Sequence, residues 1–302
     1  MIPVFYRPEM VAPATGYSPS AAKPAQVVAD WRADFDIAPD VEFVEFDPAT
    51  RAEIARAHDP AYVDGILACR IPNGFGDCDP RVAASLPYTS GSLLAAARYV
   101  TTDPADWRAR ERIACSPSSG FHHAHHAESE GFCTFNGLMV AALALKAEGL
   151  VDRVLILDCD EHYGNGTQDI IATLGVDWIT HVTHGGRLPG SYHDKPGMLG
   201  MIEWQVPEFG ADRCRAVVLY QAGADCHVRD PLGGFLTTQD MRERDRLVFR
   251  LAAQHRAPLV WNLAGGYQRD RKGRIEPVLK LHRQTMAECI AASTGATPCP
   301  QQ

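Results

Sequence analysis

Short apolar segments alternate with longer segments of helical periodicity along most of the chain. The apolar segments predict strands at residues 2–6, 41–46, 112–115, 153–158, 178–183, 216–221 and 258–263. Three of them, 153–158, 216–221 and 258–263, show little polar alternation, which is typical of strands buried on both faces of a parallel sheet. Helical periodicity predicts helices at 21–35, 50–58, 90–100, 136–148, 240–255 and 277–292. This alternation predicts an α/β fold with a doubly wound, mostly parallel sheet flanked by helices.

The chain carries no internal repeat and no low-complexity linker. Residues 1–292 are therefore expected to form a single domain, and residues 293–302 a loosely ordered tail. Thr237 and Asp240 form a start signal for the helix at 240–255. The Pro- and Gly-rich segments 71–91 and 185–199 are predicted to be long loops, which on such a scaffold often carry function.

Composition excludes several classes of protein. The 302 residues are 46% hydrophobic, with a formal net charge of −8 and no basic block, which disfavours disorder and nucleic-acid binding. Nine scattered cysteines without a C-x-x-C pair indicate reduced thiols rather than a disulfide framework. The N-terminus does not resemble a secretory signal, and the longest apolar stretch, at 138–145, is too short to span a membrane. We therefore expect a cytoplasmic protein without membrane partners.

Polar and ionisable residues gather where four of the predicted strands end. The strand at 112–115 leads into SPSSGFHHAHH, and the strand at 153–158 leads into CDEHYGNGT. The strands at 216–221 and 258–263 lead into AGADCH and AGGY. Because ligands of open parallel sheets bind beyond the carboxyl ends of the strands, these four segments predict one shared site.

Asp158, Asp160 and His162 occupy alternate positions in the segment LDCDEHYGNGT. In an extended segment alternate side chains point to one side, so these three can face the same ion. Their oxygen and nitrogen atoms suit Zn²⁺ or another divalent metal, whereas the alternative is a polar loop that caps the next helix. Asp225 would complete a set of two aspartates and one histidine, or would only cap a helix. His227 is a rival ligand in the same segment.

His122 and His123 are adjacent and follow a predicted buried strand. An imidazole titrates near neutral pH, so this pair can act as general acid and base. We expect His125 and His126 to lie on the rim or the surface. Tyr267 follows two glycines, and its phenol could donate a hydrogen bond to an oxyanion; the alternative is an ordinary buried tyrosine.

Taken in order, these four motifs resemble the histone deacetylase family of metal-dependent amidohydrolases, which includes bacterial acetylpolyamine amidohydrolases. The resemblance spans at least residues 115–270, and H-D-P-x-Y at 58–62 and S-L-P-Y-T-S-G at 85–91 extend it toward the N-terminus. It implies an arginase/deacetylase-like fold with Zn²⁺ held by Asp160, His162 and Asp225. Fe²⁺ or Mn²⁺ could replace Zn²⁺ at such a ligand set.

The resemblance also implies roles for the residues around the metal. His122 and His123 match the tandem histidines of the family, and His123 would be the general base and acid. Tyr267 matches the catalytic tyrosine. Asp158 would orient His122, and Asn165 would form a hydrogen bond with His123.

A substrate tunnel follows from the same resemblance. Gly131 and Phe132 would line it, and Leu188 would face Phe132. Leu188 replaces a common aromatic wall, so the tunnel is expected to be wider. Two further departures are Tyr163, where many members have a second histidine, and Ala264, where a glycine usually precedes Gly-Gly-Tyr.

A structural K⁺ site is the last implication of the resemblance. It would lie near Asp158, Asp160, His162 and the strand that ends at Thr183. Val182 lies where a serine often helps to hold K⁺, which weakens the expectation of this site more than that of the catalytic site.

The predicted reaction is hydrolysis of an N-acyl amide. The expected substrate is an acylated amine: an acetylpolyamine, an acetyl-lysine side chain or a small N-acyl metabolite. The acidic composition favours cationic amines by steering, whereas Arg187 beside the tunnel would favour a carboxylate-bearing molecule. The alternatives are a binuclear-manganese ureohydrolase of the arginase type and a non-catalytic protein that binds acyl ligands. The sequence leaves open whether the chain forms a homo-oligomer.

Overall fold

The computed structural model describes residues 1–13, 17–102, 112–187, 189–210 and 215–294. Within these residues, eight strands form one sheet in the order β2-β1-β3-β8-β7-β4-β5-β6. Every neighbouring pair runs parallel, which confirms the predicted fold class. The strands are β1 (Ile2–Phe5), β2 (Val41–Val44), β3 (Ile113–Ser116), β4 (Arg153–Asp158), β5 (Ile179–His184), β6 (Ser191–Tyr192), β7 (Ala216–Gln221) and β8 (Leu259–Asn262).

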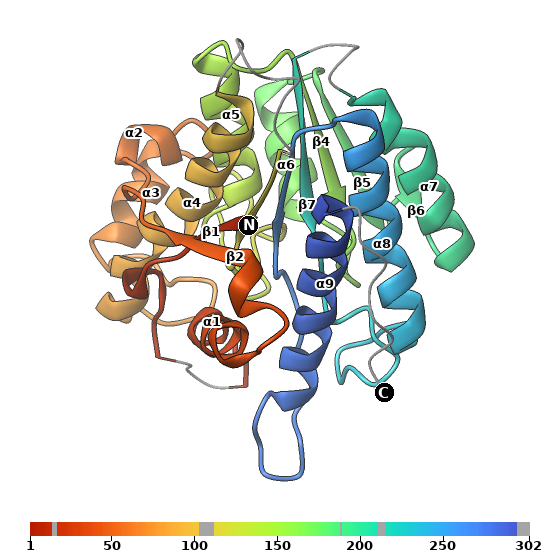
Figure 1. The fold of residues 1–302 in the computed structure, drawn as a ribbon. Coiled ribbons are helices and arrows are strands. Elements are labelled where there is room, and N and C mark those ends of the chain that lie inside the picture. The colour runs from red at the N-terminus through yellow and green to blue at the C-terminus, as the bar shows by residue number, and fades with distance from the viewer. Residues whose placement is uncertain (14–16, 103–111, 188, 211–214, 295–302) are drawn as a thin grey trace.

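Helices cover both faces of the sheet (Figure 1). One face carries α2 (Arg51–Ile54), α3 (Pro60–Leu67), α4 (Pro80–Thr101), α5 (Gly137–Ala147) and α6 (Asn165–Leu174). The other face carries α1 (Lys23–Ala33), α7 (Lys195–Glu208), α8 (Thr238–His255) and α9 (Glu276–Thr294). Two short 3-10 helices, Pro8–Met10 and Ala38–Asp40, complete the elements of the described residues.

The central strands contribute to both hydrophobic cores because successive side chains point to opposite faces. In β4, Leu155 and Leu157 pack toward α7, α8 and α9, whereas Val154 and Ile156 pack toward α4, α5 and α6. All six residues of β7 are buried. Burial on both faces is the physical reason for the continuous apolar pattern of these strands.

The segment 71–91 is not the uninterrupted loop that the sequence predicts. Helix α4 begins at Pro80, after Asp79 accepts a hydrogen bond from the Arg81 amide, and continues through Pro87. Proline lacks an amide hydrogen and usually ends a helix, so Pro87 indicated a loop. Here the helix tolerates it, and the Pro87 carbonyl accepts a hydrogen bond from the Ala49 amide.

The segment 185–199 was also predicted wrongly as one loop, because α7 begins inside it at Lys195. Asp194 caps this helix by accepting a hydrogen bond from the Gly197 amide at 2.7 Å. The sequence prediction also missed α3, α6 and the two-residue strand β6. At the C-terminus α9 reaches Thr294, two residues into the expected tail, and the remainder of that tail lies outside the described residues.

Other expectations are confirmed in part. Thr237 and Asp240 form a reciprocal capping box at the start of α8. Free thiols are found at Cys69, Cys78, Cys115, Cys133, Cys159 and Cys226, as the sequence predicts. None of the described helices combines the length and the apolar character needed to cross a membrane.

A row of buried polar side chains crosses the carboxyl end of the sheet. The register pairs Ser116 with Asn262, Asn262 with Gln221, and Gln221 with Asp158. All four residues are fully buried, so their polar atoms need hydrogen-bond partners. Gln221 Nε2, for example, donates to Asp158 Oδ1 at 2.8 Å. The sheet thereby brings the four segments of polar and ionisable residues, which follow β3, β4, β7 and β8, to one edge.

Candidate active site

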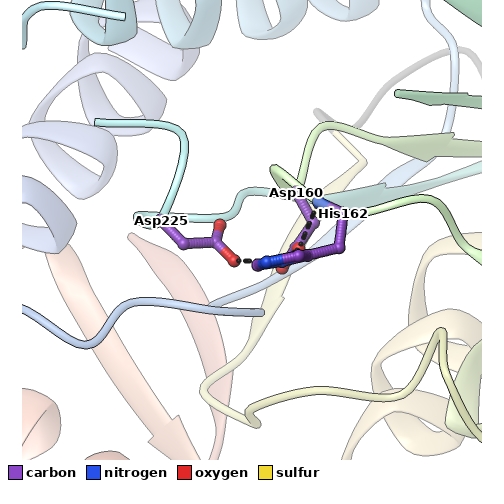
Figure 2. Close-up of side chains that lie close together, drawn as sticks. All are labelled: Asp160, His162 and Asp225. Atoms are coloured by element: carbon purple, nitrogen blue, oxygen red, sulfur yellow. Dashed lines mark hydrogen bonds and ion pairs between the residues drawn. The ribbon is translucent and has the colours of Figure 1, made fainter. Parts of the chain in front are cut away.

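Asp160, His162 and Asp225 converge beyond the ends of β4 and β7 (Figure 2). Each offers one ligand atom, and these atoms lie within 4.8 Å of one another. His162 Nδ1 lies 3.2 Å from Asp160 Oδ1 and 3.3 Å from Asp225 Oδ2. The two aspartates are buried, and His162 is partly exposed. The three predicted metal ligands therefore form a group of the size that one metal ion needs.

The electrostatics of this group fit a divalent cation. Hydrogen bonds to Asp160 and Asp225 raise the pKa of His162 to about 11. Burial, followed by the negative charge of Asp160, raises the pKa of Asp225 to about 7. Asp225 Oδ2 is buried, and its ion-pair partner is His162 Nδ1 at 3.3 Å. The site therefore holds more negative charge than its own residues neutralise, and Zn²⁺, Fe²⁺ or Mn²⁺ could balance it by displacing the proton from His162.

The loop before Tyr267 packs directly against these carboxylates. The Gly265 amide donates to Asp160 Oδ2 at 2.9 Å, and a Cβ on Gly265 would lie only 2.0 Å from Asp225 Oδ2. Glycine is therefore required at position 265. Ala264, one of the departures from the family pattern, has a φ of +51°. This left-handed conformation favours glycine, which explains the residue usual at that position.

Lys23 contacts the same loop, the one before Tyr267, and the sequence did not predict this contact. It is fully buried, and its Nζ donates to the carbonyl oxygens of Ala264 and Gly265, the latter at 3.1 Å. Burial lowers the pKa of Lys23 to about 8, although the nearby Asp225, Asp160 and Asp230 favour its charged form. Lys23 lies about 240 positions away in the sequence, so no local signal could have identified it.

Both tandem histidines make the contacts that the resemblance implied. His122 Nδ1 lies 2.7 Å from Asp158 Oδ2, and His123 Nδ1 lies 2.6 Å from Asn165 Oδ1. Burial disfavours a charge on His122, but Asp158 and Asp160 outweigh it and raise the pKa of His122 to about 9. Burial and the neighbouring His122 lower the pKa of His123 to about 4. The two rings are therefore biased toward opposite protonation states, and their catalytic roles remain predictions.

A hydrogen-bonded chain fixes the orientation of His123. Asn165 Nδ2 donates to Glu130 Oε2 at 2.7 Å, so its Oδ1 is left to accept from His123. His123 Nδ1 therefore carries the proton, and its Nε2 keeps a free lone pair. Glu130 Oε2 also lies 2.9 Å from His125 Nε2. The sequence prediction missed Glu130 and placed His125 on the rim.

Tyr267 lies beside this group and is 8% exposed. Its amide donates to Asp230 Oδ2 at 2.8 Å, and its ring stacks on Tyr17 with the centroids 6.4 Å apart. Burial, followed by the charges of Asp225 and Asp160, raises the pKa of Tyr267 well above its usual value. The phenol therefore stays protonated and remains able to donate a hydrogen bond.

Of the predicted tunnel residues, Gly131 and Phe132 can be placed, whereas Leu188 lies outside the described residues. Gly131 has a φ of +52°, and a Cβ there would lie 2.4 Å from His123 Cδ2. The Phe132 ring lies 5.9 Å from the ring of Tyr267 and 5.9 Å from that of Phe75, which the sequence prediction missed. An aromatic wall therefore stands next to the tandem histidines.

The rival ligand His227 is not in the metal group: its Nε2 lies 2.9 Å from Thr238 Oγ1, and its Nδ1 accepts a hydrogen bond from the Arg229 amide.

At the expected K⁺ site, the Tyr192 hydroxyl donates to the Asp158 carbonyl at 3.0 Å, and both carboxylate oxygens of Asp158 already have protein partners. Asp158 is thus largely saturated without an ion, and the K⁺ site remains a prediction.

His58, from the H-D-P-x-Y motif, supports the loop of the tandem histidines. Its Nδ1 lies 2.9 Å from the His125 carbonyl oxygen, and its Nε2 accepts from the Asn136 amide at 2.8 Å. A carbonyl can only accept, so Nδ1 carries the single proton of a neutral ring. Burial lowers the pKa of His58 from 6.5 to about 4. A second proton would also occupy the Nε2 lone pair that accepts from the Asn136 amide.

This contact predicts a pH dependence of stability. A histidine whose pKa is lower in the folded than in the unfolded state stabilises the fold fully above about pH 6.5, and this contribution is lost as the pH falls toward 4. The decrease in the free energy of unfolding approaches about 1.4 kcal/mol per pH unit. Urea unfolding at pH 7, 6 and 5 should show a steeper decrease for the wild type than for His58→Gln. Equal slopes would show that His58 does not titrate in this way.

Comparison with known proteins supports the family resemblance noted in the sequence. A sequence model of the histone deacetylase domain matches residues 19–182 and 202–278. An uncharacterised protein of Picosynechococcus is 27% identical over 255 residues, covering 77% of this chain and 81% of that protein. Histone deacetylase 14 of Arabidopsis thaliana, which is chloroplastic, is 28% identical over 271 residues, covering 75% of this chain and 62% of the relative.

Histone deacetylase 6 of Caenorhabditis elegans is 31% identical over 178 residues, covering 48% of this chain and 18% of that protein. The alignments thus span less than two thirds of these plant and nematode relatives. The domain match itself covers well over half of the present chain and includes Tyr267 and both segments that supply the candidate metal group. The chain therefore belongs to the histone deacetylase family of deacetylases and related amidohydrolases.

Proposed function

We propose that this protein is a zinc-dependent hydrolase that cleaves the N-acyl amide of an acylated amine. The observation that carries the proposal is the convergence of the Asp160–His162–Asp225 group with two hydrogen-bonded imidazoles whose pKa values are shifted in opposite directions. Zn²⁺ bound by those three residues would polarise the amide carbonyl and acidify a water molecule. Two carboxylates nearly cancel the charge of the ion, so a separate base is needed.

His123 is the residue best placed to supply that base. It is neutral at pH 7 because its pKa is lowered to about 4, and its Nε2 lone pair is free because Nδ1 donates to Asn165. The proton taken from water would then pass to the leaving amine. His122, hydrogen-bonded to Asp158, contributes a positive charge beside the reacting carbonyl. Tyr267 donates its phenolic hydrogen to the developing oxyanion.

An arginase-type reaction receives less support. A binuclear site needs further carboxylates or imidazoles that bridge a second ion. Within the described residues, Asp160, His162 and Asp225 form the one group of at least three such side chains whose ligand atoms lie this close. A metal analysis that gives one ion per chain favours the deacetylase reaction, and two ions per chain would favour the arginase type.

An apolar cavity next to the site could receive the acyl group of the substrate. Its enclosed volume is about 50 Å³, and the space free of atoms reaches about 510 Å³ when its opening to solvent is included. Its walls include Phe132, Phe121 next to the tandem histidines, Ser20, and Val82 and Leu86 of α4. Ser20 also lies beside the Tyr267 phenol, whose pKa burial raises and a hydrogen bond with Ser20 offsets only in part. We propose that acyl chains longer than acetyl extend into this cavity.

The test is an assay of the zinc-loaded protein on lysine peptides and polyamines that carry acetyl, octanoyl or dodecanoyl groups. We expect hydrolysis that a hydroxamate inhibits, with octanoyl substrates cleaved at least as well as acetyl substrates. Leu86→Trp should fill the cavity and reduce kcat/KM for octanoyl substrates about 10-fold relative to acetyl substrates. Leu174→Trp, at a partly exposed position at the end of α6, is the control.

The outcomes separate the two parts of the proposal. If no acyl substrate is hydrolysed while octanoyl ligands still bind, the protein is an acyl-binding protein and not an enzyme. If acetyl substrates alone are cleaved, the reaction is right and the cavity does not receive the acyl chain.

A further inference from the structure

Arg244 is a fully buried arginine in the middle of α8. It belongs to no motif noted in the sequence. Its Nη1 donates to the carbonyl oxygen of Cys159 at 3.1 Å and to that of Gly223 at 2.9 Å. A single nitrogen atom therefore joins two loops that are 64 residues apart in sequence, since Cys159 follows β4 and Gly223 follows β7.

Both of these carbonyl groups belong to metal-binding segments. Cys159 precedes Asp160 directly, and Gly223 lies two residues before Asp225. The two aspartates lie on separate loops, so their separation depends on how these loops are held together. We propose that Arg244 is a positioning residue of the metal centre, which fixes the distance between Asp160 and Asp225. This inference rests on the metal site of the proposed function.

The surroundings of Arg244 hold its guanidinium group in place. Arg244 Nε donates to Asp245 Oδ1 at 2.8 Å. Asp245 in turn accepts hydrogen bonds from the Tyr220 hydroxyl and, at 2.6 Å, from Thr285 Oγ1 of α9. The donor is thus anchored to β7, α8 and α9. A guanidinium fixed in this way offers several hydrogens in a planar array, which a flexible lysine does not.

Packing alone gives no reason for this residue. Arg244 Nη2 is buried without a hydrogen-bond partner, which is an energetic penalty. Apolar side chains of similar volume often replace a buried ion pair without loss of stability. Retention of the charge therefore needs another reason, and the contact with both ligand loops supplies one.

The experiment measures zinc affinity in Arg244→Met and Arg244→Lys by competition with a chromophoric chelator, well below the melting temperature of each metal-free variant. We expect the dissociation constant for Zn²⁺ to rise about 10–100-fold in Arg244→Met, as for other residues that hold metal ligands in place. Arg244→Lys should show a smaller rise, because an ammonium group cannot reproduce the planar contacts.

Arg246→Met is the matched control. Arg246 lies on the same helix, but it pairs with Glu288 of α9, with Nε 3.0 Å from Oε2. The affinity of the Arg246→Met variant for Zn²⁺ should stay at the wild-type value. If Arg244→Met does not fold, Arg244→Lys carries the test. A folded Arg244 variant that binds Zn²⁺ as tightly as the wild type overturns the inference, whereas retention of zinc by Asp160→Ala would instead overturn the metal site.

Discussion

Asp160→Ala should be isolated without a bound metal ion and without hydrolase activity. Asp160 Oδ1 lies 3.2 Å from His162 Nδ1, and the same side chain accepts from the Gly265 amide. Its removal takes away one of three ligands and half of the carboxylate charge of the group. Metal content measured by plasma mass spectrometry, after equilibration with Zn²⁺ and gel filtration, gives the result directly.

The control for this experiment is Asp64→Ala. Asp64 pairs with Arg51 at the surface, where both side chains are about half exposed and contribute little to stability. This variant should keep one zinc ion per chain. Full zinc occupancy in Asp160→Ala would show that the ligand set is wrong, and the proposed function would then lose its basis.

His123→Ala should keep its metal and lose kcat by about 10²–10⁴-fold, the range typical of a positioned acid–base group. The reason is that His123 is neutral, oriented by Asn165 and next to the metal group, with 5.8 Å between the centroids of the His123 and His162 rings. Tyr267→Phe should lose about 10²-fold, because one oxyanion donor contributes about 3 kcal/mol. Both variants need a zinc determination beside the steady-state kinetics.

Asn165→Asp serves as a companion to His123→Ala. The new carboxylate keeps an acceptor for His123 Nδ1. It also places a negative charge beside Glu130, which in the wild type accepts from Asn165 Nδ2. The pH–rate profile should shift toward higher pH, since a neighbouring carboxylate raises the pKa of the imidazole. Wild-type turnover in His123→Ala with zinc bound would remove His123 from the mechanism.

The sequence by itself determined the parallel α/β class and the composition of the candidate metal group. Continuous apolar runs at 153–158 and 216–221 require strands buried on both faces, and such strands occur in parallel sheets. The carboxyl ends of parallel strands meet at one edge, so residues that follow them must lie close together. The sequence therefore predicts that Asp160, His162 and Asp225 lie together, and the structure brings them together.

Only the tertiary structure shows which distant residues contact the loops of this site. Lys23, Glu130 and Arg244 act through contacts with residues that are distant in the chain, and no periodicity or spacing marks them. The helix that continues through Pro87 was hidden for a similar reason, because packing overrides the local preference of proline. Local pattern reports which face of an element is buried, whereas partners across the core depend on how the elements dock. The sequence thus specifies which side chains could bind a metal ion, and the fold sets the distances between them.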